Sequence, residues 1–387
     1  MSAVCAAPLA PAAPRASTPT SASQLAVDLS AVAANVATIR RRTTAEVMAV
    51  VKADGFGHGA VDVARTALAH GATSLGVTRL EEAFALRTAG LRAPVLSWLN
   101  PVDTNWVRAA DAGVEVAVPS LPHLRAVATA AARSGRTVTV HLHADVGMSR
   151  DGASPTEWGP LVAQAARAQR RRLVRVVGIM GHLGLADLPG GDPDGRAAFD
   201  RAVAVAAAVG LRPRRHLAAT AAVLTDPATH HDLVRVGAGL VGIDPSGTVT
   251  LRPAMRLIAP VLQVREVPAG SLVGYGRSHR TRAATRLALL PVGYADGLPR
   301  QAAGAAEVLL GGRRRRVVGP VSMDQVVVDL GSDPAPVRPG DLATVFGPGD
   351  AGEPTVADWA RWAGTLPHAI VTGLGHRSTR VVRGGAR

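Results

Sequence analysis

Lysine is almost absent from this sequence. Among 387 residues with a combined Lys and Arg count of 43, Lys52 is the single lysine. Arginine supplies the basic side chains everywhere else, but only a primary amine can condense with an aldehyde. Lys52 follows the apolar stretch VMAVV and precedes the glycine-rich ADGFGHG, which argues against a chance surface lysine. We therefore expect Lys52 to react covalently with a carbonyl group.

Aromatic residues are also scarce, at 3% of the sequence. The two tyrosines, Tyr275 and Tyr294, each lie in a glycine-flanked motif, GYGR and VGYADG. Either phenol can serve a functional site or fill a buried contact, and composition favours neither reading. Because 47% of the residues are hydrophobic, a large core is still expected, built mainly from Ala, Val, Leu and Ile.

Cysteine occurs once, at Cys5, which excludes an intrachain disulfide and agrees with a cytoplasmic location. No apolar run in the sequence reaches the roughly 20 residues of a membrane-spanning helix, so no membrane partner is expected. Residues 1–23 lack the basic start of a signal peptide, and several prolines interrupt their apolar stretch. We interpret residues 1–23 as a disordered extension.

The formal net charge is +14, and arginines cluster at 170–172 and 313–316. Such clusters can bind nucleic acid. The sequence has few aromatic residues to stack on bases and no nucleic-acid-binding motif, so we expect solvated arginine and no nucleic-acid partner. No metal ligands are predicted.

Short β-branched runs alternate with amphipathic, Ala-rich stretches between residues 24 and 250. The predicted strands are 47–51, 73–78, 94–98, 114–118, 137–142, 174–180, 214–218 and 233–236. The predicted helices include 29–40, 60–70, 79–89, 120–134 and 194–209. Eight strands alternating with helices favour a (β/α)8 TIM-type barrel over the alternative, a doubly wound open sheet.

After residue 250 the pattern changes. Runs such as RLALLPV and QVVVDL are separated by Pro and Gly, without long helices between most of them. This pattern predicts a β-rich C-terminal domain. The expected organisation is an extension at 1–23, an α/β barrel at 24–250 and a β domain at 251–387.

Active sites of barrels lie at the C-terminal ends of the strands. The polar residues expected there are Lys52, Asp145, Arg150, His182, Thr220 and Arg235. Thr220 offers a hydroxyl and the segment Gly237–Ala238–Gly239 offers unobstructed backbone N–H groups to a phosphate. An amine, a phosphate cradle and two arginines at one mouth suggest a site for pyridoxal 5'-phosphate.

The segment AVVKADGFGHGA closely resembles the cofactor-lysine signature of alanine racemases. The resemblance continues in order through VGMSRDG, MGHLGLAD, HLAAT, DLVRVGAGLVG, RPAM, GYGR, LLPVGYADG, VSMDQVVVDLG and GEPTVADWA, over about residues 24–385. It implies an α/β barrel with a C-terminal β domain that residues 24–28 join. It also implies pyridoxal phosphate, a small amino-acid substrate, and a head-to-tail homodimer with shared active sites that supplies D-alanine for peptidoglycan.

The resemblance implies two bases acting on opposite faces of the substrate. Lys52 would bind the cofactor and serve one face, and Tyr275 of the other subunit would serve the opposite face. Arg235 would contact the pyridine nitrogen of the cofactor. His182 would contact Arg235 or Tyr275 and help to set the proton affinity of the tyrosine.

The remaining roles implied by the resemblance concern the phosphate and the substrate. Thr220, Gly237 and Ala238 would hold the cofactor phosphate. The substrate carboxylate would be bound by Arg150 and the backbone N–H of Met323. Tyr294 would narrow the entrance from the partner subunit.

Several positions depart from the usual pattern of the family and put substrate choice in question. Position 143 is His, where many members carry a carbamylated lysine that orients the substrate arginine, so Asp145 is expected to orient Arg150 instead. Position 56 is Phe rather than Tyr. The other departures are Ala219, Thr220, Gly274, His368 and Ala369.

Two alternatives to alanine racemisation stay open on the sequence. The same fold can racemise another small amino acid, such as serine, in a specialised pathway. A barrel protein can also bind pyridoxal phosphate without turnover, although Tyr275 and the VSMDQ segment argue against this.

Overall fold

The computed structural model describes residues 22–332 and 337–384. Most of the predicted extension at 1–23, with Cys5, therefore lies outside the described residues. Ser23 lies inside them, and it is buried at the edge of the C-terminal sheet. Its hydroxyl is 2.7 Å from the Ser378 hydroxyl, and its carbonyl oxygen accepts from the Thr379 N–H.

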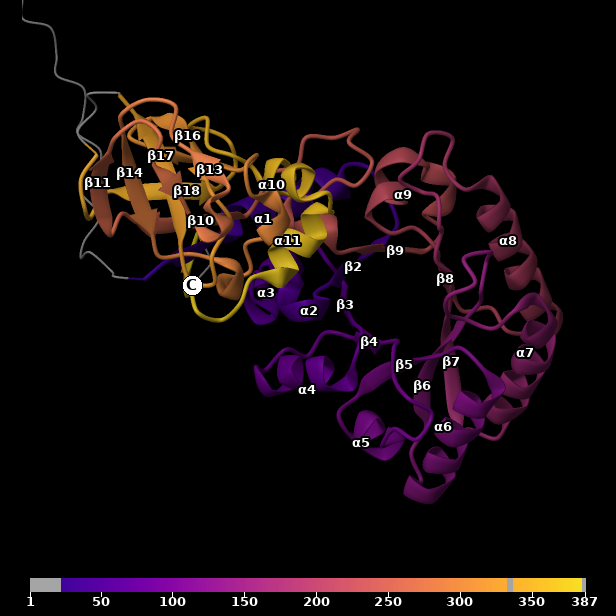
Figure 1. Cartoon of the computed structure of the whole chain (residues 1–387). Coiled ribbons are helices and arrows are strands. Elements are labelled where there is room, and N and C mark those ends of the chain that lie inside the picture. The colour runs from indigo at the N-terminus through magenta and orange to yellow at the C-terminus, as the bar shows by residue number, and fades with distance from the viewer. Residues whose placement is uncertain (1–21, 333–336, 385–387) are drawn as a thin grey trace, which may run out of the picture.

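The first domain is a barrel of eight parallel strands (Figure 1). The hydrogen-bonded order is β8-β7-β6-β5-β4-β3-β2-β9. The strands are β2 (Glu46–Val50), β3 (Ser74–Val77), β4 (Val95–Ser97), β5 (Val114–Val118), β6 (Val138–His143), β7 (Val174–Met180), β8 (Arg214–His216) and β9 (Leu233–Val236). The ring closes between β8 and β9 through two backbone hydrogen bonds. The Asp232 N–H donates to the Arg215 carbonyl oxygen, and the Arg235 N–H donates to the Ala218 carbonyl oxygen. This confirms the predicted barrel and excludes the open sheet.

Helices cover the outside of the barrel (Figure 1). They are α1 (Leu29–Arg40), α3 (Ala60–Ala69), α4 (Leu80–Thr88), α5 (Trp106–Asp111), α6 (Leu121–Ser134), α7 (Pro155–Arg170), α8 (Pro193–Ala208) and α9 (Thr220–Thr225). Helix α1 begins after Asp28, whose carboxylate accepts the Ser30 N–H at 2.8 Å. Its buried face carries Val32, Val36 and Ile39 at helical spacing, so burial of this stripe orients the helix on the barrel.

The second domain is built on a nine-stranded, mostly antiparallel sheet. Its order is β11-β14-β17-β16-β15-β18-β10-β1-β19. The strands are β1 (Gln24–Asp28), β10 (Met255–Pro260), β11 (Gln263–Val267), β14 (Thr285–Leu290), β15 (Glu307–Leu310), β16 (Arg313–Val318), β17 (Val326–Gly331), β18 (Leu342–Phe346) and β19 (Thr379–Arg383). A two-stranded ribbon, β12 (Leu272–Val273) with β13 (His279–Arg280), and helices α10 (Val356–Ala363) and α11 (Pro367–Gly373) complete it.

The first strand of the chain belongs to the second domain and links it to the barrel. Strand β1 precedes the barrel in sequence but pairs with β10 and β19 of the sheet, with Leu25 opposite Leu257 and Arg380. Helix α11 lies against the segment that follows β2, because a Cβ added at Gly57 would collide with the Val371 carbonyl oxygen. The C-terminal sheet is thereby fixed beside the start of the barrel (Figure 1).

Candidate functional site at the barrel mouth

Lys52 lies at the C-terminal end of β2, where the chain turns sharply. The next residues, Ala53 to Gly57, all have positive φ, which for non-glycine residues is a costly conformation. The turn is held by Glu82, whose carboxylate accepts the Ala53 N–H at 2.6 Å and the Thr78 N–H at 2.9 Å. Arg380 of β19 donates to the Asp54 carboxylate at 2.7 Å. Contacts from a barrel helix and from the second domain therefore fix the lysine segment.

The amine of Lys52 is electrostatically perturbed. Burial and the positive charge of Arg150 lower the pKa of Lys52, and the charge of Glu82 opposes this shift. A lowered pKa increases the fraction of neutral amine, which is the form that attacks a carbonyl or accepts a proton. Lys52 also acts on His182 and His368, lowering the pKa of both in addition to burial. These effects indicate that Arg150, Glu82, His182 and His368 all lie near Lys52.

Arg235 of β9 is buried at the floor of the mouth. Its terminal nitrogens donate to the carbonyl oxygens of Gly181 and His216, each at 2.7 Å, and one lies 3.5 Å from His182 Nδ1. Among the described residues, no hydrogen bond is formed by its Nε–H. Burial lowers the pKa of Arg235 to about 10, so it stays charged at neutral pH. Burial and the charge of Arg235 lower the pKa of His182 to about 3, so this imidazole is neutral.

Thr220 and the Gly237–Ala238 segment lie together on the same side of the mouth. Helix α9 begins at Thr220 and a short 3-10 helix begins at Ala238. The Gly239 N–H donates to Thr220 Oγ1 at 3.2 Å, which joins the two helix starts. Such starts present backbone N–H groups and favour anions. The Phe56 ring covers the segment, because a Cβ at Gly237 would lie 2.7 Å from it.

Arg150 lies in the loop after β6, beside a small hollow that His143, Asp145 and His182 also line. Asp145 does not pair with Arg150 among the described contacts; its carboxylate accepts the N–H groups of Gly147 and Ser149 and shapes the loop. The expectation that Asp145 orients the guanidinium is therefore wrong. His143 is buried 3.5 Å from the Asp151 carboxylate.

The remaining predicted residues lie in the C-terminal domain and are exposed. Tyr275, Tyr294 and Met323 have relative exposures of 68%, 39% and 53%. Tyr294 and Met323 are neighbours, since the Tyr294 and Ala295 N–H groups donate to the carbonyl oxygens of Ser322 and Met323. Within the described residues, no hydrogen bond or ring contact joins Tyr275 to Lys52. The structure of one chain therefore brings together the barrel residues and leaves this second group apart.

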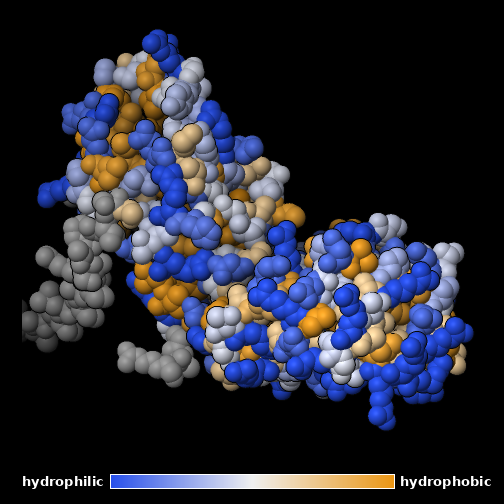
Figure 2. Space-filling view, turned by 90° about the horizontal axis from the view of Figure 1, so that it is seen from below, coloured by the Kyte–Doolittle hydropathy of each residue, from blue (hydrophilic) through white to orange (hydrophobic). Residues whose placement is uncertain are grey.

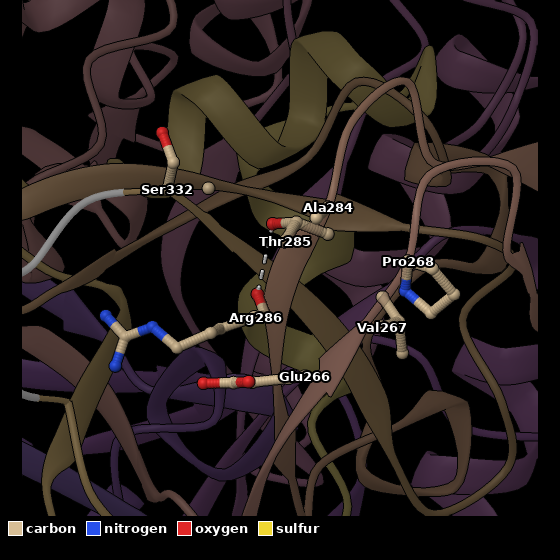
Figure 3. A pocket seen from close by; sticks show the side chains of 8 residues that line it. Glu266, Val267, Pro268, Ala284, Thr285, Arg286 and Ser332 are labelled. Carbon is tan, nitrogen blue, oxygen red and sulfur yellow. Dashed lines mark hydrogen bonds between the residues drawn. The ribbon is translucent and has the colours of Figure 1, made fainter.

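A second, larger hollow lies in the C-terminal domain. It has a volume of about 630 Å³ and is lined by Glu266, Val267, Pro268, Ala284, Thr285, Arg286, Gly331 and Ser332. Several of its lining residues belong to β11 and β14. Figure 3 shows their side chains, with the Thr285 hydroxyl donating a hydrogen bond to the Arg286 carbonyl oxygen. None of the predicted site residues lines it, so we place the candidate site at the barrel mouth.

Sequence reasoning missed residues that support the site from a distance. Glu82 was not a candidate, although it lies three residues after Arg79 at a predicted helix start, where a glutamate can accept the N–H of the N-cap residue, as it does here at 3.0 Å. His216 and His141 were also missed. A polar residue inside an otherwise apolar strand, as in TVTVHLH, was the available signal, because buried polar groups need partners.

Comparison with known proteins shows the family to which this chain belongs. Residues 27–245 match the family model of the alanine racemase N-terminal domain, and residues 254–382 match that of the C-terminal domain. An alanine racemase of Salinispora tropica is 46% identical, covering 93% of this chain and 97% of its own length. That of Mycolicibacterium smegmatis is 45% identical, covering 96% of each chain.

Solved structures give the same result. The alanine racemase of Streptomyces coelicolor superposes with a TM-score of 0.91 at 42% identity, covering 94% of this chain and 98% of its own. The alanine racemase of Bartonella henselae, solved with covalently bound pyridoxal phosphate, has a TM-score of 0.86 at 26% identity, covering 94% and 100%. This chain therefore belongs to the alanine racemase family, whose members are isomerases that interconvert L- and D-alanine with pyridoxal phosphate.

Proposed function

We propose that this chain racemises alanine by a two-base reaction, with Lys52 as one base and Tyr275 of a second subunit as the other. The observation that carries the proposal is the placement of the single lysine. It follows the barrel strand β2, is partly buried, and shares its surroundings with Arg150 and His182. Arginine at this position would keep a positive charge but could not bind an aldehyde.

The residues at the mouth fit pyridoxal phosphate. Lys52 would bind it covalently, and Thr220, Gly237 and Ala238 would hold its phosphate. The free Nε–H of Arg235 would face the ring nitrogen, since its terminal nitrogens already donate to carbonyl oxygens. When bound, the cofactor supplies an aldehyde and a conjugated ring that withdraws electrons from the substrate Cα. A positive arginine at the ring nitrogen disfavours its protonation and so limits that withdrawal.

Lys52 can exchange a proton at the substrate Cα. Its lowered pKa, caused by burial and Arg150, leaves part of the Nζ groups neutral and able to accept that proton. Racemisation needs a second group on the opposite face of Cα. We assign the second face to Tyr275 of the partner subunit, the role that the resemblance to alanine racemases implies for this residue.

The neutral His182 connects Arg235 to this tyrosine in the proposal. Arg235 donates to His182 Nδ1, which leaves the proton of the neutral ring on Nε2. An Nε2–H donor beside the phenol oxygen would stabilise the phenolate form of the tyrosine. His182 thereby makes a tyrosine usable as a base.

A head-to-tail homodimer would bring the two groups together. Exposed apolar side chains occur around the mouth, at Leu99, Met148, Leu185 and Leu188, and on the sheet domain, at Leu272, Tyr275, Tyr294 and Met323. On the face seen in Figure 2, hydrophobic residues form patches on both lobes of the molecule. Mutual covering of these two sets would bury apolar surface and complete each site.

The substrate carboxylate would be bound by Arg150 and by the Met323 N–H of the partner. Among the described residues, this N–H donates to no acceptor, so it is available to a ligand. Tyr294 would stand at the entrance beside Met323 and limit the size of the substrate side chain. Its ring is held by Arg300, whose guanidinium carbon lies 5.8 Å from the ring centre.

The surrounding roles follow from this activity. We propose that the product D-alanine serves peptidoglycan synthesis in the cytoplasm and that the domains divide near residue 250. Sequence alone supports the location, through the single cysteine. In the structure, no helix of the described residues has the length and apolar character needed to cross a membrane.

The test is a racemase assay with L-alanine and L-serine, run beside Lys52→Ala and Lys52→Arg. We expect alanine to turn over faster than serine, and both variants to lose the activity and the absorbance of the lysine-bound cofactor. The arginine variant keeps the charge, so its loss would isolate the need for an amine. A cofactor-loaded wild type that turns over serine but not alanine would contradict the assigned substrate.

A further inference from the structure

A row of four polar side chains crosses the core of the barrel below the mouth. At one end, Arg235 Nη1 lies 3.2 Å from His216 Nδ1. His216 Nε2 lies 2.9 Å from His141 Nδ1, and His141 Nε2 lies 2.8 Å from the Glu115 carboxylate at the other end. These residues, called the buried polar row below, come from β9, β8, β6 and β5. Barrel interiors are normally filled by branched apolar side chains. Four polar side chains in a barrel interior therefore point to a structural or functional role.

The two ends of the row determine where its protons lie. A guanidinium only donates hydrogen bonds, and an ionised carboxylate only accepts them. His216 Nδ1 must therefore accept from Arg235, so His216 donates from Nε2 to His141. His141 must then donate from Nε2 to Glu115. Both rings are thus neutral, and each is restricted to the Nε2–H tautomer.

The electrostatics of the row agree with this assignment. Burial, together with the charge of Arg235, lowers the pKa of His216 well below its ordinary value. Burial alone would raise the pKa of Glu115, but the hydrogen bond from His141 and the charges of nearby arginines together outweigh burial and lower the pKa. Glu115 is therefore a carboxylate, and among the described residues Arg235 forms no ion pair with any carboxylate directly.

The barrel is shaped to admit the row. His141 and His216 pack edge to face, with ring centres 5.0 Å apart and planes at 86°. Strand β7 lies between their strands, and a Cβ added at Gly178 would overlap the His141 ring. The pairing of β6 with β7 also shifts register between Val140 and His141. A glycine and a register shift at the same point provide the space for this contact.

We propose that Glu115 is a positioning residue for the racemase site, acting through His141 and His216 to fix Arg235 as a donor toward the mouth. The proposal rests on the proposed placement of the cofactor ring nitrogen against Arg235. Without Glu115, the row no longer ends in a group that can only accept hydrogen bonds. The donor-to-acceptor direction of the hydrogen bonds along the row can then reverse. A reversed row puts the Nδ1–H of His216 against the N–H of Arg235, so the guanidinium must turn and the ring nitrogen loses its fixed neighbour.

The test uses the holoenzyme reconstituted with pyridoxal phosphate labelled with ¹⁵N in the ring. In Glu115→Leu we expect the ring ¹⁵N resonance to move away from its wild-type position. Alanine turnover should fall by about tenfold or more, as for loss of a buried hydrogen bond to a charged group. Glu115→Gln should lie between this variant and the wild type, because its amide oxygen can still accept from His141.

Two further variants separate positioning from general damage. Gly178→Ala keeps all four polar side chains but displaces the His141 ring, so it should move the same resonance. Glu46→Leu removes a glutamate of β2 that pairs with Arg214 at 2.8 Å outside the row, and it should leave the resonance unchanged. A folded, loaded Glu115→Leu protein with the wild-type resonance and turnover would overturn the proposal.

A measurement on the wild type covers the case in which these variants fail to fold. In imidazole ¹⁵N spectra of histidine-labelled holoenzyme, the His141 and His216 rings, recognised by the ¹⁵N–¹⁵N coupling across the hydrogen bond between them, should be neutral and carry the proton on Nε2. A charged His141 or His216 ring, or one that carries its proton on Nδ1, would contradict the row. If the wild type itself binds no cofactor or leaves alanine unchanged, the proposed function fails; if only the resonance test fails, the inference about Glu115 fails alone.

Discussion

At the scale of single residues, the site depends on how one amine is held. Lys52 follows a strand and is succeeded by five residues of positive φ, a path that the backbone does not take without support. Glu82 provides that support, because its carboxylate accepts N–H groups from both Ala53 and Thr78. Its negative charge also counteracts the lowering of the Lys52 pKa by burial.

Glu82→Gln should therefore weaken cofactor retention. The amide can replace only part of the hydrogen bonds and none of the charge, so we expect roughly a tenfold loss of apparent affinity for pyridoxal phosphate. Titration of the apoprotein, followed by absorbance, measures this. Glu81→Gln is the matched control, since the neighbouring Glu81 is exposed. Equal retention in both variants would show that Glu82 does not hold the lysine segment.

At the scale of elements, the lysine segment is fixed by a helix of the other domain. A Cβ added at Gly57 would collide with the Val371 carbonyl oxygen of α11, and the φ of Gly57 is +79°. Gly90 has a similar φ of +84°, but a Cβ there would meet no atom within 4 Å. These two glycines separate the cost of backbone strain from the cost of a collision between elements.

We predict that Gly90→Ala destabilises the fold by about 1 kcal/mol, the ordinary cost of a left-handed alanine. Gly57→Ala should reduce the free energy of unfolding several times more than Gly90→Ala does. It should also lower cofactor loading, because α11 and the lysine segment must separate. Denaturant unfolding and the absorbance of the bound cofactor report the two effects. A Gly57→Ala protein as stable and as fully loaded as Gly90→Ala would show that the contact with α11 is unimportant.

The elements were more predictable than the contacts between them. Each barrel strand begins and ends within about two residues of its predicted bounds. Buried parallel strands are predictable in this way because they form short, distinct runs of apolar residues. The positions of Lys52, Arg235 and Thr220 at strand ends follow from the same runs. In contrast, His141 and His216 are 75 residues apart, and Asp54 and Arg380 are 326 apart. No local pattern specifies such pairs, because they depend on how strands and domains pack.

At the scale of the whole molecule, buried neutral histidines make the fold sensitive to acid. His58 is buried, and its Nδ1–H donates to the Phe56 carbonyl oxygen at 2.8 Å. Burial lowers the pKa of His58 from 6.5 to about 4. Between these values the unfolded chain binds a proton that the folded chain does not. Stability that is complete above pH 6.5 is therefore lost as the pH falls toward 4.

In His58→Gln, the free energy of unfolding that is lost as the pH falls from 6.5 to 4 should be smaller by up to about 3 kcal/mol, since each unit of pKa shift corresponds to about 1.4 kcal/mol. The free energy of unfolding, measured by denaturant between pH 7 and pH 4, shows the effect as a smaller slope. His70→Gln is the control, because His70 is exposed. An unchanged slope in His58→Gln would mean that other buried groups, such as His182 and His216, account for the acid sensitivity.

We predict that Lys52 and Tyr275 meet only between two subunits. Tyr275 is 68% exposed on the sheet domain of one chain, while Lys52 lies at the barrel mouth. Two inactive variants can therefore restore each other if their subunits mix. A hybrid dimer of Lys52→Ala with Tyr275→Phe would have one site with both bases and one site with neither.

The direct measurement is alanine racemisation after the two variants are unfolded together and refolded with pyridoxal phosphate. Random pairing makes half of the dimers hybrids with one of two sites intact, so activity should recover to about a quarter of that of refolded wild type. Each variant refolded alone should stay inactive. If differently tagged subunits are shown to have mixed and no activity returns, the shared two-base site is contradicted.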